Sequence, residues 1–214
     1  MRVLNLYAGI GGNRKLWTDV DVTAVELNPD IAKIYQDFFP DDKVIVADAI
    51  DYFEKHFHEY EFVWASPPCQ SYTRINRFNV ARRYNGEDTI KVKIPDFRLY
   101  SIINFLSVYY RGSWAVENTY SDYKPLKPAQ QIGRHFIWGN KIIPDYKGAK
   151  PFHNIEKHCT LKELCEIHEL PFDTINTFTI KSIDKKQMVR NCVNPELGLH
   201  IFKSMNNQEL KLDL

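Results

Sequence analysis

The feature that most constrains the fold is an alternation of short apolar runs with segments of helical character. Apolar runs at residues 2–7, 22–25, 44–46, 61–65 and 113–116 each have the length of a buried strand. Helices are predicted to begin at residues 13–18 and to cover residues 29–38, 49–53 and 95–110. Strands that alternate with helices predict a doubly wound α/β fold with a mostly parallel sheet.

Chemically useful side chains and glycines stand where these apolar runs end. They are Gly9, Gly11 and Gly12 after the first run, Glu26 and Asp48 after the next two, and Cys69 and Glu117 after the last two. In a doubly wound sheet, ligands bind beyond the carboxyl ends of the strands. We therefore expect these positions to share one rim of the molecule.

The first two runs suggest a nucleotide site. A strand, a glycine turn and a helix start form a layout in which the backbone passes close to a ligand. Glu26 ends the second run, where a carboxylate can accept both ribose hydroxyls of an adenosine, although it could also be an exposed strand end. Asp48 could accept a bond from the adenine amine, cap the helix that starts at Ala49, or do both.

Residues 66–70, Ser-Pro-Pro-Cys-Gln, follow the fourth run. The two prolines end the strand because each lacks an N–H donor and has a fixed φ. A cysteine in such a turn is expected to face a cleft. The alternative is an ordinary proline turn that contains an inert, buried thiol.

The overall composition limits the class of protein. A chain of 214 residues is long enough for one domain with a real core, and a net charge of +1 argues against a strongly basic nucleic-acid binder. The four cysteines and the histidines show no metal-ligand spacing, so no metal is expected, and Cys159, Cys165 and Cys192 are predicted core thiols. The sequence contains no signal peptide or bilayer-spanning run, which favours a reduced, cytoplasmic protein without membrane contact.

Residues 74–93 differ in character from the rest of the chain. Arginines and lysines there are interleaved with Tyr84 and Phe78, a mixture that suits phosphates and bases. The segment could also be a solvated surface loop. The functional interpretation is a loop that contacts nucleic acid.

In their order along the chain, these motifs resemble the DNA cytosine-5 methyltransferase family. The resemblance runs through residues 6–12, 26–28, 47–48, 67–70, 117–119, 130–134, 160–165 and 187–195. Ile132 stands where the family's Gln-x-Arg-x-Arg motif has its first arginine, and Arg190 replaces the glycine of the closing motif. Only residues 140–158 remain where the family has a long target-recognition segment.

The resemblance implies a Rossmann-like methyltransferase fold that uses S-adenosylmethionine. The implied cofactor-binding residues are Tyr7, Gly9, Gly11, Gly12, Glu26, Leu27, Asp48, Pro68, Asn191 and Val193. The implied catalytic residues are Cys69, Glu117 and Arg134, and the expected nucleic-acid contacts are Gln70, Ser71, Arg74, Arg77, Arg82 and Arg83.

The implied chemistry is addition of the Cys69 thiolate to carbon 6 of cytosine, while Glu117 donates a hydrogen bond to ring nitrogen 3. A helix N-terminus or a nearby arginine is expected to lower the pKa of the thiol. The base must be flipped out of a duplex or arrive single-stranded. No side chain is assigned as the final base, a role that water can fill.

Three divisions of the chain are expected: a catalytic and cofactor-binding domain at residues 1–140, a vestigial target-recognition linker at 141–158, and helices at 159–214 that complete the catalytic domain. The last residues, 206–214, are expected to be frayed. DNA is the expected partner, RNA is the alternative, and a protein partner could supply target specificity. A third interpretation is a non-catalytic module that binds cofactor or nucleic acid, or a subunit that another chain completes. The economy of the chain suggests a bacterial or phage gene.

Overall fold

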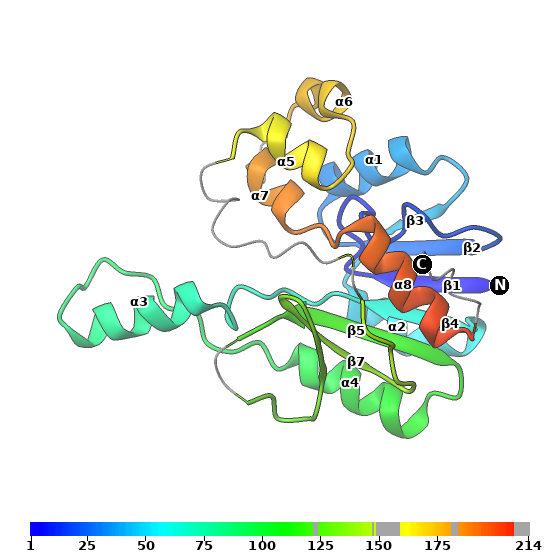
Figure 1. The fold of residues 1–214 in the computed structure, drawn as a ribbon, viewed down its shortest axis with the longest axis horizontal. Helices are drawn as coiled ribbons and strands as arrows, with labels where there is room; N and C mark the ends of the chain where they lie inside the picture. Colours follow the sequence, from blue (N-terminus) through cyan, green and yellow to red (C-terminus); the bar gives the residue numbers. More distant parts are fainter. Residues whose placement is uncertain (122–123, 147, 149–158, 181–183, 208–214) are drawn as a thin grey trace.

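The computed structural model describes residues 1–121, 124–146, 148, 159–180 and 184–207 (Figure 1). A seven-stranded sheet with the order β3-β2-β1-β4-β5-β7-β6 forms its centre. The strands are β1 (Arg2–Leu6), β2 (Asp21–Glu26), β3 (Lys43–Val46), β4 (Phe62–Ala65), β5 (Ser113–Thr119), β6 (Gln130–Ile132) and β7 (His135–Gly139). The first five strands are parallel, and β7 runs antiparallel to its neighbours β5 and β6.

Helices cover both faces of this sheet, which confirms the predicted doubly wound α/β class (Figure 1). On one face, α2 (Ala49–His56) and α4 (Arg98–Tyr109) pack on alternate side chains of the strands, including Leu4 and Val63. On the other face, α1 (Pro29–Phe38) packs on Ala24, and α8 (Pro195–Met205) packs on Phe62. The central strands β1, β4 and β5 therefore bury both of their faces, as expected for a parallel sheet, whereas the edge strand β3 has no fully buried residue.

Three short helices form an outer layer over α1. They are α5 (Leu161–Ile167), α6 (Phe172–Thr177) and α7 (Lys185–Arg190). Elsewhere, a 3₁₀ turn at Phe57–Glu59 follows α2. The thiols of Cys159 and Cys165 lie buried in this layer with Cys192, so the prediction of core thiols is confirmed.

Side-chain caps fix where the main helices begin. Asn28 accepts a bond from the Asp30 N–H at 3.0 Å, and Pro29 occupies the first turn of α1. Asp48 caps α2 through the N–H groups of Ile50 and Asp51, as one of its two predicted roles required. These caps are local, which is why sequence located these starts well.

The helix expected at residues 13–18 is absent, and this prediction was wrong. Turns closed by bonds such as Arg14 N–H to the Gly11 carbonyl oxygen occupy the segment instead. Trp17 is pinned by stacking on Phe202 of α8, with ring centroids 4.8 Å apart, and Asp19 adopts a positive φ of 57°. Too few residues remain before β2 to offset the unfavourable nucleation of a helix.

The segment expected as a loop at residues 74–93 begins instead with a helix, α3 (Arg74–Tyr84). Thr73 caps it by accepting from the Asn76 N–H at 3.3 Å. No residue of α3 is buried, and Figure 1 shows it projecting from the body of the protein. We call residues 74–93 the arm.

Strands β6 and β7 were not predicted either, because each is short and lies at or near a sheet edge.

The expected linker and tail lie mostly outside the described part of the chain. Residues 147 and 149–158 of the linker, and 208–214 of the tail, are among those the structure does not describe. The threefold division of the chain therefore stays a prediction.

A substitution at Gly198 can test the contact between α8 and the turn at Asn13. A Cβ at this position would lie 2.5 Å from the Asn13 carbonyl oxygen. Replacing a helical glycine by alanine ordinarily stabilises a helix by about 1 kcal/mol. Here we expect Gly198→Ala to lower the free energy of unfolding in urea by about 1–3 kcal/mol, because overpacking outweighs helix propensity. A gain in stability would contradict the packing described.

Candidate active site

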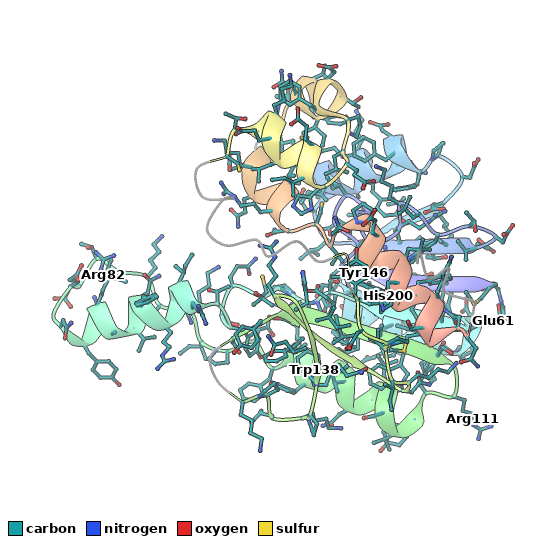
Figure 2. All side chains as sticks on the ribbon, viewed as in Figure 1. Glu61, Arg82, Arg111, Trp138, Tyr146 and His200 are labelled. Carbon is teal, nitrogen blue, oxygen red and sulfur yellow. The ribbon has the colours of Figure 1, made fainter. Side chains whose placement is uncertain are left out.

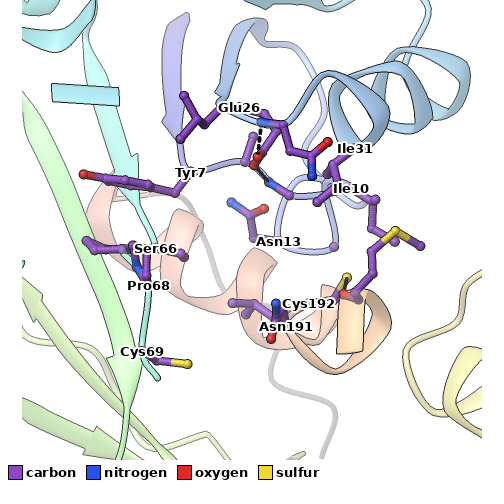
Figure 3. A pocket seen from close by; sticks show the side chains of 18 of the residues that line it. Tyr7, Ile10, Asn13, Glu26, Ile31, Ser66, Pro68, Cys69, Asn191 and Cys192 are labelled. Atoms are coloured by element: carbon purple, nitrogen blue, oxygen red, sulfur yellow. Dashed lines mark hydrogen bonds between the residues drawn. The ribbon is translucent and has the colours of Figure 1, made fainter. Parts of the chain in front are cut away.

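The strand order reverses between β1 and β4, the switch point at which doubly wound sheets bind ligands. The turn after β1 and the proline loop after β4 lie side by side there and line a cavity of about 720 Å³. Figure 3 shows Glu26 and Ile31 at one end of this cavity and Cys69 at the other. One continuous cavity thus joins the expected cofactor residues to the expected nucleophile.

The glycine turn opens onto the cavity at Gly9. Its φ of +55° favours glycine, and a Cβ there would meet nothing within 4 Å. Its N–H donates to Glu26 Oε2 at 3.0 Å, while Glu26 Oε1 accepts from the Asn28 N–H at 2.9 Å. Each carboxylate oxygen keeps a further lone pair that a ligand hydroxyl could use.

The other two glycines are closely packed against neighbouring residues, and Gly12 also lines the cavity. A Cβ on Gly12 would lie 2.7 Å from the Val193 carbonyl oxygen, so the segment between α7 and α8 closes one wall of the cavity. A Cβ on Gly11 would lie 2.8 Å from the Tyr35 ring, and Gly11 does not line the cavity. The expectation that Gly11 faces a ligand therefore differs from what the structure describes.

Asp48, Tyr7 and Arg98 lie together on the cavity wall. Asp48 Oδ1 is used by its helix cap, whereas Oδ2 lies 3.7 Å from Arg98 Nη1. Burial raises the pKa of Tyr7 to about 12, and the charge of Arg98 opposes that shift. Sequence reasoning missed Arg98, since nothing in its spacing distinguishes it from any residue at the start of α4.

The proline loop is tied to β5 by a buried amide. Asn118 Nδ2 donates to the Pro67 carbonyl oxygen at 2.9 Å, and Asn118 is only 1% exposed. This bond sets the loop of Cys69 against the strand of Glu117, and both side chains line the same cavity. The structure therefore brings the predicted pair, Cys69 and Glu117, to the wall of one cavity.

The environment of Cys69 differs from the one we expected. Its pKa is raised to about 11, first by burial and then by the negative charge of Glu117. The positive charge of Arg134 lowers this pKa but does not offset those two effects. The next helix along the chain, α3, begins only at Arg74, five residues after the thiol.

His135 is the main residue that sequence reasoning overlooked. It follows Arg134 directly, and both residues line the cavity. Its Nδ1 lies 2.6 Å from Glu117 Oε1. The pairing of β5 with β7 creates this contact, and neither strand's own sequence signals it.

The remaining expected cofactor residues also line the cavity. Leu27 lies at its rim, while Pro68, Asn191 and Val193 form parts of its wall. Arg190 lines the cavity as well, at the position where the resembling family has a glycine.

The expected nucleic-acid contacts are only partly gathered at the cavity. Gln70 lines it, and Ser71 lines a smaller adjoining cavity of about 410 Å³. Arg74 and Arg77 lie on the exposed surface of α3, where the Arg74 guanidinium lies 5.9 Å from the centre of the Tyr120 ring. Figure 2 shows Arg82 at the far end of the arm. Arg82 pairs with Glu87 at 2.5 Å, and Arg83 pairs with Asp88 at 3.0 Å.

Two further properties concern the described residues alone. Within them, no helix has both the length and the apolar character that crossing a bilayer requires. The same residues contain no group of three or more His, Cys, Asp or Glu side chains arranged to hold a metal ion.

Comparison with known proteins supports the resemblance noted in the sequence. Residues 1–87 match the family model for C-5 cytosine-specific DNA methylase. This range includes the glycine turn, Glu26, Asp48 and Cys69. No protein with curated function matched the sequence. The resemblance to cytosine-5 methylases is thus confirmed over the N-terminal part of the chain.

Among solved structures, the Entamoeba histolytica methyltransferase EhMeth aligns over 97% of this chain and 98% of its own, with 14% identity and a TM-score of 0.54. This likeness confirms the methyltransferase fold. A Spodoptera frugiperda DNMT2 mutant is 21% identical over 55% of this chain, with a TM-score of 0.39. The alignment spans 35% of that DNMT2 chain, about a third of its length.

The raised pKa of Cys69 gives a direct test of the cavity. Because the thiolate is the reactive form, alkylation of Cys69 by iodoacetamide should accelerate about tenfold per pH unit between about pH 7 and 10. At pH 8, Glu117→Gln should accelerate the reaction by removing a negative charge, and Arg134→Ala should slow it. Mass spectrometry of the Cys69 peptide measures the rate, and equal rates in all three proteins would contradict the electrostatics described.

Proposed function

We propose that this protein transfers a methyl group from S-adenosylmethionine to carbon 5 of cytosine in DNA, through a covalent adduct with Cys69. The observation that carries the proposal is that Cys69 and Glu117 line the same cavity as Gly9 and Glu26. The match of residues 1–87 to the cytosine-5 methylase model supports the same chemistry.

The residues at the glycine end of the cavity fit an adenosyl cofactor. Gly9 leaves open space next to the backbone, Glu26 has lone pairs for ribose hydroxyls, and Asp48 has one oxygen outside its helix cap. The proposed cofactor-binding set is completed by Tyr7, Gly12, Leu27, Pro68, Asn191 and Val193. Gly11 packs against the rings of Tyr35 and Phe39 outside the cavity. When bound, S-adenosylmethionine supplies an electrophilic methyl group and a positive charge.

Cys69 and Glu117 divide the chemistry on the base between them. As the base binds, the Cys69 thiol passes its proton to the Glu117 carboxylate. The resulting thiolate forms a bond to carbon 6, and Glu117 gives that proton to nitrogen 3, so that negative charge does not accumulate on the ring. Carbon 5 thereby becomes nucleophilic. After the methyl group is in place, water removes the proton on carbon 5, the bond from sulfur to carbon 6 breaks, and nitrogen 3 returns its proton to Glu117.

The high pKa of the Cys69 thiol fits a nucleophile that forms its reactive thiolate only when cofactor and base are bound. In the free protein, burial and Glu117 keep the thiol protonated near neutral pH. A cation that enters the cavity favours the thiolate, and so does the loss of the Glu117 charge when that carboxyl is protonated. Arg134, which already acts in this direction, is the third proposed catalytic residue.

Nucleic acid would approach from the side of the arm. A base in a duplex must be extruded to reach Cys69, which costs a few kcal/mol. Gln70 and Ser71 immediately follow the nucleophile, and the arm continues from them with Arg74, Arg77, Arg82 and Arg83. We propose that these residues hold the strand around the flipped base. A protein partner that binds the arm or the segment at 141–158 would supply target specificity.

Cys69→Ser tests the covalent route. Because a hydroxyl is a far weaker nucleophile than a thiolate, methyl transfer should fall by about a thousandfold or more. The affinity for S-adenosylmethionine, measured by calorimetry, should change by less than about threefold. Cys165→Ser is the matched control, since that thiol is buried in the outer layer away from the cavity.

The substrates in this assay separate the proposed activity from its alternatives. Matched DNA and RNA oligonucleotides are compared for methyl transfer, and DNA containing 5-fluorocytosine is used to trap the Cys69 adduct. Transfer only to RNA would replace DNA as the substrate. Absence of both transfer and adduct, with cofactor bound, would refute the catalytic proposal and favour a binding subunit.

The arm's contribution can be measured through salt. If Arg82 and Arg83 exchange their carboxylate partners for phosphates, Arg82→Ala with Arg83→Ala should reduce the slope of log affinity against log salt by about 1.8, at about 0.9 per contact. Glu87→Gln with Asp88→Asn is the matched opposite, because it removes the carboxylate charges paired with both arginines and should tighten binding. An unchanged slope in the arginine variant would remove the tip of the arm from the interface.

A further inference from the structure

Within the described part of the chain, one close partner holds the Glu117 carboxyl. Among the described residues, its side chain makes one hydrogen bond, from Oε1 to His135 Nδ1, at 2.6 Å. The His135 and Glu117 side chains are only 14% and 11% exposed, so water competes weakly for this bond. A short bond in such a place is well suited to fix the orientation of the carboxyl.

Strand pairing explains how the two side chains meet. In the antiparallel ladder of β5 and β7, Glu117 lies opposite Ile137, and His135 is two residues from Ile137 along β7. Side chains two residues apart on a strand share a face, so His135 is the diagonal neighbour of Glu117. The rigid ladder therefore holds the imidazole beside the carboxyl, on the wall of the cavity that also contains Cys69.

We propose that His135 is the positioning residue for Glu117 in the cytosine reaction. Its Nδ1–H donates to Glu117 Oε1, which leaves Oε2 and its proton directed to nitrogen 3 of the base. This inference rests on the function proposed above and deepens it, because the histidine acts through the acid and forms no bond to the base.

The proton balance follows from this arrangement. As the Cys69 sulfur bonds to carbon 6, the proton on Oε2 moves to nitrogen 3, and Glu117 becomes a carboxylate. The Nδ1–H bond to Oε1 then becomes charge-assisted and stronger. When the bond from sulfur to carbon 6 breaks, the proton returns to Oε2, and His135 has neither gained nor lost one.

Two substitutions separate hydrogen bonding from the volume of the ring. His135→Phe keeps the ring and removes the donor, whereas His135→Asn places an amide N–H at about the position of Nδ1. We expect His135→Phe to lower kcat for methylation by about tenfold or more, since a misoriented acid loses its catalytic effect. KM for cofactor and for DNA should stay within about twofold. His135→Asn should recover most of the loss in kcat.

The control is His200→Phe on α8, where the ring contacts the Pro144 carbonyl oxygen outside the cavity (Figure 2). Circular dichroism verifies that each variant folds. A normal kcat in His135→Phe would overturn the inference, and so would an asparagine variant as slow as the phenylalanine variant, because the donated bond would then not be what matters.

Nuclear magnetic resonance distinguishes failure of this inference from failure of the proposed function. In the protein without DNA, the Nδ1 proton of His135 should give a downfield signal that is present in the wild type and lost in Glu117→Ala. If that signal is seen but the wild type forms no adduct with 5-fluorocytosine DNA, the cytosine chemistry fails. If the adduct forms but the signal is absent, only the role of His135 fails.

Discussion

Parallel pairing of β1 with β4, and of β4 with β5, is the constraint on which the cavity depends. It sets the carboxyl ends of three strands next to one another, and the chain leaves each strand at the same edge of the sheet. Because of this pairing, the glycine turn, the proline loop and Glu117 line one cavity although they are far apart in the sequence. The bond from Asn118 to the Pro67 carbonyl oxygen then holds the loop against β5.

The Glu26 carboxylate and the Cys69 thiol, at the two ends of the cavity, have different surroundings. At the glycine end, backbone N–H groups satisfy the Glu26 carboxylate and leave it able to accept more bonds. At the other end, burial and a neighbouring acid keep the Cys69 thiol protonated. A thiol held in this way is protected from adventitious oxidation and alkylation, because the thiolate is the reactive form. On the proposed function, its reactivity would then depend on the presence of cofactor and base.

The C-terminal helices are close to the cavity as well as to the core. The Val193 carbonyl oxygen packs against Gly12, and α8 covers one face of the sheet. We propose on this basis that residues 159–214 complete the catalytic domain and form no separate unit. The arm, by contrast, buries none of the side chains of α3, and the Thr73 cap fixes the start of that helix. This difference fits the proposal that the cavity binds cofactor and base while the arm contacts nucleic acid.

The sequence by itself determined the five parallel strands, the caps of α1 and α2, and the chemically distinctive residues of the cavity wall, such as Gly9, Glu26 and Cys69. Periodicity, prolines and capping side chains act within a few residues, and the carboxyl ends of parallel strands share an edge, so local patterns were sufficient there. Only the tertiary structure decided the missing helix at 13–18, the direction of the Cys69 pKa shift, and the positions of Gly11, Arg98 and His135 relative to the cavity. Each of these depends on atoms brought from distant parts of the chain: Phe202 against Trp17, Glu117 beside Cys69, and β7 laid antiparallel to β5.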